Sequence, residues 1–181
     1  MRTRYMKWVA LALVAVAASL ASTAIAFAHD NGGVSLRDVR DATKQYKHVE
    51  VAEAAKYGRF LDAQGIACID MPGMGAMGIH YVNGDLVGDD TVDPLHPEAL
   101  VYEPLPHGGL RLVALEYIVF KDAWDASHHH PPSLFGQEFN FTPDGNRFGI
   151  PAFYSLHAWI FKANPAGMFE MWNPDVTCAF A

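Results

Sequence analysis

Three polar residues lie inside apolar stretches, and their types are those of metal ligands. His80 lies in "MGIHYVN", Glu116 in "LRLVALEYIVF" and His157 in "FYSLHAWIF". Two neutral imidazoles and one carboxylate can hold a divalent ion and leave coordination positions open for water or a substrate. We therefore interpret His80, Glu116 and His157 as candidate ligands of a divalent metal (Zn, Cu or Fe).

Each of these residues also has a structural interpretation, as a core side chain hydrogen-bonded to its surroundings. They are far apart in the sequence and lack the short spacing of an H-x-H or H-E-x-x-H motif. An ionised carboxylate in an apolar strand is costly unless it is paired, hydrogen-bonded or metal-bound, and otherwise its pKa rises. Without a metal, Glu116 and His157 would be candidates for general acid or base catalysis.

Strand signals predict how the three residues are positioned. Short apolar runs bounded by Gly, Pro, Asn and Asp predict strands near 77–82, 99–103, 110–120 and 153–162, and a weaker one near 66–70. Because side chains alternate along a strand, Glu116 is predicted on the face of Leu110, Leu112, Ala114, Ile118 and Phe120. The same alternation predicts that His157 shares a face with Phe153 and Trp159.

Aromatic and polar residues of these runs are candidates for the lining of a small-molecule pocket. Such pockets combine apolar walls with a few polar groups that orient the ligand. The predicted lining consists of Tyr102, Glu103, Gln137, Phe153 and Trp159.

A helical segment is expected before the strands. Ser35 is a plausible N-cap, and the spacing of apolar residues up to Phe60 is helical, with a break expected near Lys47. A helical start followed by strands joined by turns predicts an α+β fold. We expect an N-terminal helix or helices and then a curved antiparallel sheet or small β-barrel.

The first 28 residues have the features of an export signal. Arg2, Arg4 and Lys7 precede a long apolar run that ends in small residues at Ala26 and Ala28. A single membrane anchor is the alternative, although serines interrupt the run and no basic flank follows it. We therefore expect residues 1–28 to be a signal peptide and 29–181 a single globular domain, periplasmic or extracellular, without a stable membrane anchor.

The charge of the chain limits its partners. The formal net charge is −7, and removing 1–28 would take away three basic and no acidic residues, giving about −10. An acidic protein repels the nucleic-acid backbone, so no nucleic-acid partner is expected. A small-molecule ligand or a metal ion is the expected partner.

The two cysteines, Cys68 and Cys178, are predicted to form a disulfide. Export would place them where disulfides persist. A two-cysteine metal site is the alternative, but neither residue has a cysteine or histidine nearby at ligand spacing.

Two histidine-rich features admit a different function. His128, His129 and His130 are consecutive, and His29 would be the first residue if cleavage follows Ala28. An N-terminal histidine can chelate copper, and adjacent imidazoles can bind metal. A solvated loop is the alternative for 128–130, and His130 covering the mouth of the pocket is a third.

Several short motifs together resemble an uncharacterised family of exported bacterial proteins. These are "MGIHYVNG", "PEALVYEP", "LVALEYIVF", "PPSLFGQEF", "FYSLHAWIFKANPAGMFEMWNP" and the terminal "VTC". The resemblance extends from about Tyr46 to Cys178. It implies a single exported domain and assigns no activity.

The features combine into one functional hypothesis with two alternatives. We expect an exported small-molecule pocket protein, with a divalent metal held by two histidines and a glutamate and with hydrolytic or oxidative chemistry. The alternatives are a non-enzymatic binding protein for a small apolar ligand and a periplasmic metal carrier using the histidine-rich segments. The sequence leaves open whether the protein is an enzyme.

Overall fold

The structure is a computed structural model that describes residues 33–181. The predicted signal peptide and His29 lie outside the described residues. The described chain begins with α1 (Leu36–Thr43), followed by the 3-10 helix η1 (Lys44–Lys47) and α2 (Val49–Ala54). The predicted break near Lys47 is confirmed. The Ser35 hydroxyl accepts the Asp38 N–H, and the Asp38 carboxylate accepts the Ser35 N–H, which is a capping box.

Seven strands form the main sheet, in the order β1-β3-β4-β5-β9-β8, with β2 also paired to β3. Their bounds are β1 (Gly58–Arg59), β2 (Cys68–Met71), β3 (Gly75–Val82), β4 (Ala99–Pro104), β5 (Leu110–Phe120), β8 (Asn140–Thr142) and β9 (Phe153–Ala158). All pairs are antiparallel. A separate two-stranded sheet contains β6 (Ser133–Leu134) and β7 (Gln137–Glu138).

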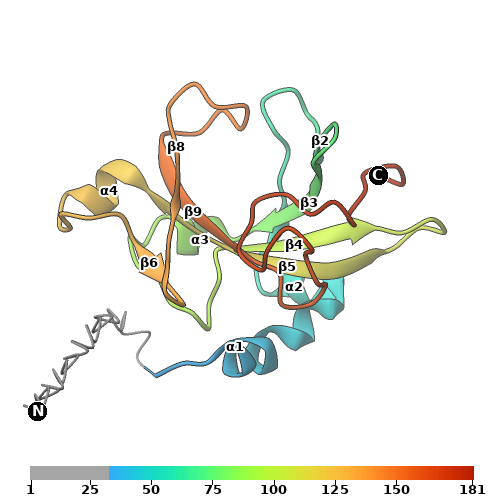
Figure 1. Cartoon of the computed structure of the whole chain (residues 1–181), viewed down its shortest axis with the longest axis horizontal. Helices are drawn as coiled ribbons and strands as arrows, with labels where there is room; N and C mark the ends of the chain where they lie inside the picture. The colour runs from blue at the N-terminus through green and yellow to red at the C-terminus, as the bar shows by residue number, and fades with distance from the viewer. Residues whose placement is uncertain (1–32) are drawn as a thin grey trace, which may run out of the picture.

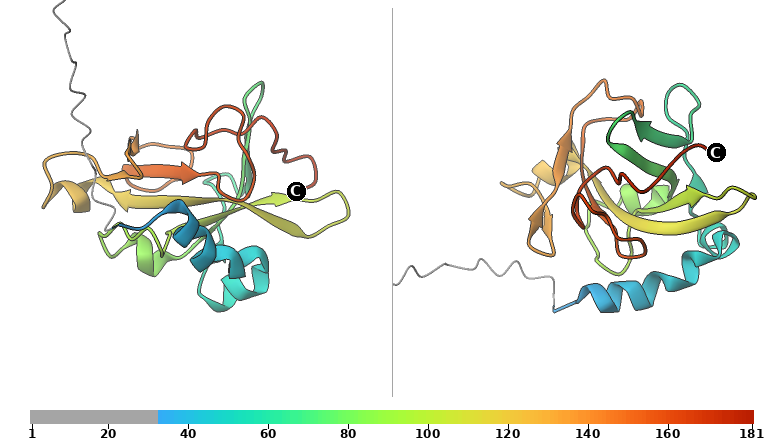
Figure 2. Two further views of the ribbon diagram at one scale, coloured as in Figure 1. Left: turned by 60° about the horizontal axis from the view of Figure 1, so that its bottom comes forward. Right: turned by 45° about the vertical axis from the view of Figure 1, so that its right-hand side comes forward.

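The main sheet is open, so the small-barrel alternative is wrong for the part of the chain that the structure describes. β1 and β8 lie at opposite ends of the strand order. The antiparallel sheet itself is confirmed, and Figures 1 and 2 show that its long central strands are strongly twisted. The helices are not confined to the N-terminal side, because α3 (Gly84–Val87) and α4 (Lys121–Asp125) lie between strands.

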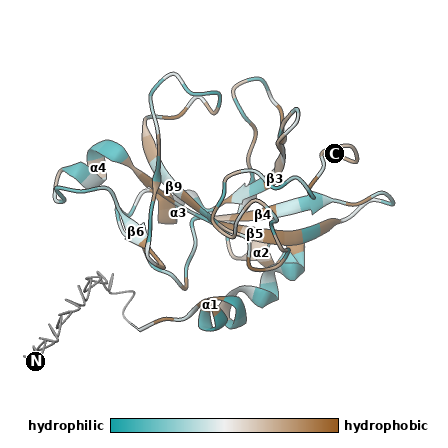
Figure 3. Cartoon of the chain, viewed as in Figure 1, coloured by the Kyte–Doolittle hydropathy of each residue, from teal (hydrophilic) through white to brown (hydrophobic). Residues whose placement is uncertain are grey.

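The N-terminal helices cover one face of the sheet, which we call the helix face (Figure 2). Val39 of α1 and Ala52 of α2 are fully buried and belong to one apolar cluster with Leu100, Leu115 and Tyr117. Figure 3 shows hydrophobic residues along β5 and hydrophilic residues on much of α1. The opposite face of the sheet, which we call the site face, carries two smaller apolar clusters.

A β-bulge changes which residues of β5 share a face. The pairing of β4 with β5 shifts between Val101 and Tyr102, so that Val101 pairs with Ala114 but Tyr102 pairs with Leu112. Leu112 therefore joins the cluster on the helix face, whereas Ala114 packs on the site face with Val113. The prediction of one unbroken face from Leu110 to Phe120 is wrong at this point, because an extra residue reverses the alternation.

Two close approaches on β3 require glycine. A Cβ on Gly78 would lie 2.6 Å from the Tyr102 carbonyl oxygen, and one on Gly75 would lie 2.1 Å from that of Asn173. The first approach brings β4 close to β3. The second allows the C-terminal segment to cross the site face, where Ala76 forms a bridge with Asn173.

The predicted disulfide between Cys68 and Cys178 is confirmed. It joins β2 to the C-terminal segment across a sequence separation of 110 residues, with a Cα–Cα distance of 5.6 Å. Among residues 33–181, no helix has the length and apolar character needed to cross a membrane.

Candidate metal centre

Glu116 and His157 face each other on adjacent strands at the middle of the sheet. They are register partners between β5 and β9. Register partners project to the same face, which is here the site face. The His157 Nδ1 atom lies 3.6 Å from Glu116 Oε1.

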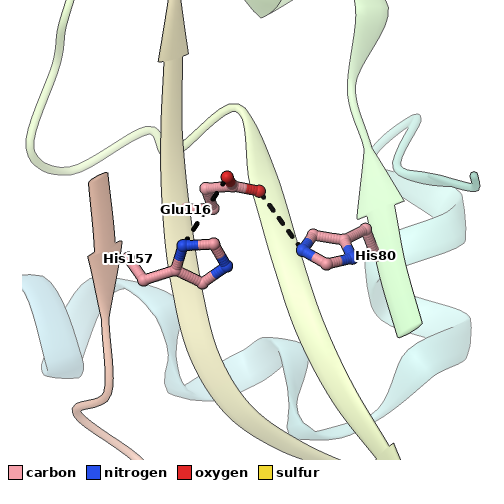
Figure 4. A group of neighbouring side chains, drawn as sticks. All are labelled: His80, Glu116 and His157. Atoms are coloured by element: carbon pink, nitrogen blue, oxygen red, sulfur yellow. Dashed lines mark ion pairs between the residues drawn. The ribbon is translucent and has the colours of Figure 1, made fainter. Parts of the chain in front are cut away.

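His80 reaches the same carboxylate from β3, although β4 lies between β3 and β5. The residue of β4 that pairs with Glu116 is Ala99, which is fully buried. The residue of β4 that pairs with His80 is Val101, two residues further along, so the imidazole approaches the carboxylate diagonally across β4, with Nε2 at 3.3 Å from Glu116 Oε2. Figure 4 shows the carboxylate of Glu116 between the two imidazoles.

The three side chains are close enough to share one ion. One ligand atom from each of His80, Glu116 and His157 lies within 4.8 Å of those from the other two. Bonds of about 2.0–2.2 Å place the donor atoms of one ion about 3–4 Å apart. The donor atoms therefore need to approach one another by at most about 1–2 Å to close on a metal. The predicted convergence of these residues is confirmed, and the described residues contain no other such group of three.

The Glu116 carboxylate is ionised although it is buried. Burial by itself raises its pKa, but the imidazoles of His157 and His80 and the Ser155 hydroxyl outweigh burial and lower the pKa to about 2. A raised pKa is therefore not observed, and Glu116 lacks the property of a general acid. It has instead the charge state of a metal ligand.

His157 is the least satisfied of the three residues. Its side chain is 1% exposed, and within the described residues neither ring nitrogen has a hydrogen-bond partner. Burial lowers its pKa, and the Glu116 charge opposes that effect. Trp159 lies beside it with the two rings 16° from parallel. A buried imidazole whose nitrogens have no hydrogen-bond partner is costly unless a ligand binds it.

A cavity of about 410 Å³ lies next to the centre, and both His80 and Glu116 line it. The remaining wall is mostly apolar and comes from strands, α3 and one loop. The lining residues are Gly58, Arg59, Phe60, Val82, Gly84, Val87, Ile118, Phe120, Phe148, Ile150 and Phe153. This volume is in the range of small-molecule sites.

Of the five predicted pocket residues, Phe153 lines this cavity and the others lie elsewhere. Tyr102 is on the helix face, where its hydroxyl donates to the Tyr46 carbonyl oxygen at 2.6 Å. Glu103 is paired with Arg111 and Lys162. Gln137 lines a smaller hollow of about 260 Å³. The Trp159 indole N–H donates to the Glu170 carbonyl oxygen at 2.6 Å.

The part of the cavity that sequence reasoning missed is the wall formed by Phe148 and Ile150. These residues come from the loop between β8 and β9 and carry no pattern of their own. The loop is attached to the segment after β1, because Arg147 pairs with Asp62 at 2.8 Å and the Ala63 N–H donates to the Arg147 carbonyl oxygen. By contrast, Ile118 and Phe120 could have been found from their alternation with Glu116.

The triple histidine lies away from the centre. His128, His129 and His130 are exposed, and none of them lines the cavity. The His128 ring stacks on Trp124 with centroids 3.6 Å apart, and the Trp124 indole N–H donates to the His130 carbonyl oxygen. This placement agrees with the interpretation of residues 128–130 as a solvated loop.

No protein-family model, curated protein or solved structure matches the chain. The resemblance to exported bacterial proteins therefore stays a prediction.

Proposed function

We propose that this protein binds one divalent transition metal through His80, Glu116 and His157, and that the bound ion presents open coordination positions to the adjacent cavity. The observation that carries the proposal is the buried His157, whose ring nitrogens have no hydrogen-bond partner in the described chain while Nδ1 lies 3.6 Å from the Glu116 carboxylate.

The donor set supports a borderline metal. Imidazole nitrogen suits Zn, Cu and Fe, and the single carboxylate leaves a net positive charge on a divalent ion. Three protein ligands are also the usual number at catalytic zinc sites, where water or substrate occupies the remaining position. Such an ion can polarise a carbonyl oxygen or lower the pKa of a bound water, which is the basis of hydrolytic chemistry.

Metal titration of untagged protein tests the proposal. After treatment with a chelator, wild-type protein should bind about one equivalent of Zn²⁺ or Co²⁺, measured by competition with a chromophoric chelator. Glu116→Gln keeps the shape of the side chain but removes the charge, and His80→Ala removes one donor. Each should weaken binding by more than about tenfold.

The matched control is His96→Ala, which removes an exposed imidazole that pairs with Asp93 far from the centre. It should leave the affinity unchanged. Circular dichroism must show that each variant is folded. Folded wild-type protein that binds none of Zn²⁺, Co²⁺, Cu²⁺ and Fe²⁺ stoichiometrically would refute the proposal.

A non-enzymatic binding function is the second candidate, and the apolar cavity favours it. Val87, Ile118 and Phe153 of the lining are buried, so the cavity offers an apolar ligand a dry wall. In this case a ligand would bind equally well to metal-free protein. A metal carrier that uses His29 and residues 128–130 is the other alternative. Deleting 128–130 would remove metal binding from such a carrier, whereas it should leave the metal affinity of the His80, Glu116 and His157 centre unchanged.

A further inference from the structure

We propose that the cavity binds a small molecule with an apolar ring system and one hydroxyl group, oriented with the hydroxyl at His80 and Glu116. The placement of the hydroxyl beside a metal rests on the proposed function. The binding of the ring system does not, because it depends only on the apolar walls.

The apolar end of the cavity is built from rings and branched side chains. Phe148 stands between Phe60 and Phe153, with ring centroids at 6.3 Å and 5.9 Å respectively. Ile118 and Val87 belong to the same apolar cluster as Phe153. Aromatic side chains favour ring ligands through offset and edge contacts. An apolar cavity of about 150 Å³ can hold benzene, so about 410 Å³ admits a fused or substituted ring.

The polar end is limited to two side chains. Among the lining residues, His80 and Glu116 supply the only polar side chains that point to the site face. Arg59 also lines the cavity, but it pairs in register with Tyr81, which packs on the helix face. Its side chain is therefore directed away from the centre, and its backbone forms the wall. A single polar group on the ligand is enough to match this end.

A hydroxyl is the polar group that fits a carboxyl group beside an imidazole, because it can both donate and accept a hydrogen bond. It can donate to a Glu116 oxygen, and its own oxygen can accept from the His80 ring or bind a metal ion held by the three ligands. A ligand carboxylate would instead lie directly against the Glu116 carboxyl group. A hydrocarbon would offer this polar end no partner.

The cavity is formed before any ligand binds, because its outer wall is fixed. The loop that carries Phe148 and Ile150 is attached by the pair of Arg147 with Asp62, whose side chain is 1% exposed. The Asn146 side chain also donates to the Ile150 carbonyl oxygen at 2.8 Å. A preformed site loses little free energy to ordering when the ligand binds.

Gly58 provides a position at which the cavity can be filled without disturbing the fold. A Cβ on Gly58 would meet no atom within 4 Å, and its φ is not positive. It pairs with Val82, which lines the cavity, so a side chain at 58 projects toward the same space. Leu61→Ala is the control, because Leu61 belongs to the same segment, is 51% exposed and does not line the cavity.

The experiment measures the affinity of 2-naphthol and naphthalene for metal-free and metal-loaded protein, with 2-naphthol followed by its fluorescence and naphthalene by competition. We expect 2-naphthol to bind about tenfold or more tightly than naphthalene, because a hydrogen bond to a charged group contributes that much. Gly58→Leu should weaken both ligands by more than about tenfold and leave the metal content unchanged, and Leu61→Ala should change neither.

The outcomes separate this inference from the proposed function. If metal binds stoichiometrically but 2-naphthol does not bind, or if Gly58→Leu has no effect on its binding, the inference is wrong and the metal centre stands. If 2-naphthol binds in the cavity but no metal binds, the metal centre is wrong and the ligand assignment stands. Equal affinities for 2-naphthol and naphthalene would show that the polar end of the cavity does not recognise a hydroxyl group.

Discussion

Two buried carboxyl groups, Glu116 on β5 and Glu98 directly before β4, lie close together, and their surroundings shift their pKa values in opposite directions. Glu116 has two imidazoles beside it and is ionised. Glu98 is 2% exposed and has one clear partner, the Ile118 N–H, which donates to Oε2 at 2.9 Å. Burial dominates there and raises the pKa of Glu98 to about 8, which keeps this carboxyl protonated near neutral pH.

The raised pKa of Glu98 predicts a pH-dependent stability. The folded protein retains this proton up to about pH 8, whereas the unfolded chain releases it near the ordinary value of 4.5. Glu98 therefore contributes most stability below about pH 4.5, and that contribution is lost as the pH rises to about 8. In Glu98→Gln, the loss of unfolding free energy between pH 5 and 8 should be smaller than in wild type by about 2–4 kcal/mol.

Urea unfolding at the two pH values, with a chelator present to remove metal, measures this difference. Because wild type and Glu98→Gln are measured in the same buffers, the contributions of the other titrating groups cancel in the difference between them. Parallel pH dependences for wild type and Glu98→Gln would show that Glu98 is not the group responsible.

At the scale of the elements, strand β4 decides whether the centre can form. It separates His80 on β3 from Glu116 on β5, and its Ala99 is the register partner of Glu116, whereas its Val101 is the register partner of His80. Two apolar clusters of the site face, one with Val101 and one with Ala99 and Phe153, adjoin the three polar residues.

Ala99→Leu should remove the metal site. The larger side chain would lie beside Glu116, its register partner, and crowd the carboxylate that both imidazoles approach. It should also lower the unfolding free energy by about 1–3 kcal/mol through overpacking. Metal affinity should fall by more than about tenfold. Metal titration and urea unfolding of the same preparation measure the two effects.

Ala158→Leu is the matched control, because Ala158 is equally buried but packs on the helix face. It should cost similar stability and leave metal affinity unchanged. Loss of metal binding in both variants would mean that general destabilisation, and not the position of Ala99, removes the metal.

The strands β2, β3, β4, β5 and β9 and the three polar residues could be predicted because alternation depends on local sequence, whereas the short strands β1, β6, β7 and β8 were missed. His157 and Phe153 share a face, as predicted. The bulge in the pairing of β4 with β5 could not be predicted, because both strands remain apolar through it. The cavity wall was missed for a different reason, since the position of Phe148 depends on the ion pair of Arg147 with Asp62, which are 85 residues apart.

At the scale of the whole molecule, the disulfide attaches the C-terminal segment to the sheet. Cys68 lies on β2, and Cys178 follows Val176, which packs with Trp159 and Val101 on the site face. The segment that crosses the site face is therefore covalently fixed at its end. This arrangement closes the apolar cluster next to His157.

Removing this disulfide should lower the unfolding free energy by about 3–5 kcal/mol, because the closed loop is long. The double variant Cys68→Ser with Cys178→Ser, compared with wild type by urea unfolding, measures the effect. A reducing agent should lower the stability of wild type but not of the double variant. Equal stability of the two proteins under oxidising conditions would contradict the prediction.

Anomalous X-ray diffraction can show whether His80, Glu116 and His157 hold one metal ion. Crystals of untagged protein equilibrated with Zn²⁺ would be measured above and below the zinc absorption edge. The account predicts one strong anomalous peak about 2 Å from a nitrogen of each histidine and from an oxygen of Glu116. No peak at this position, or a peak only at the exposed histidines 128–130, would contradict it.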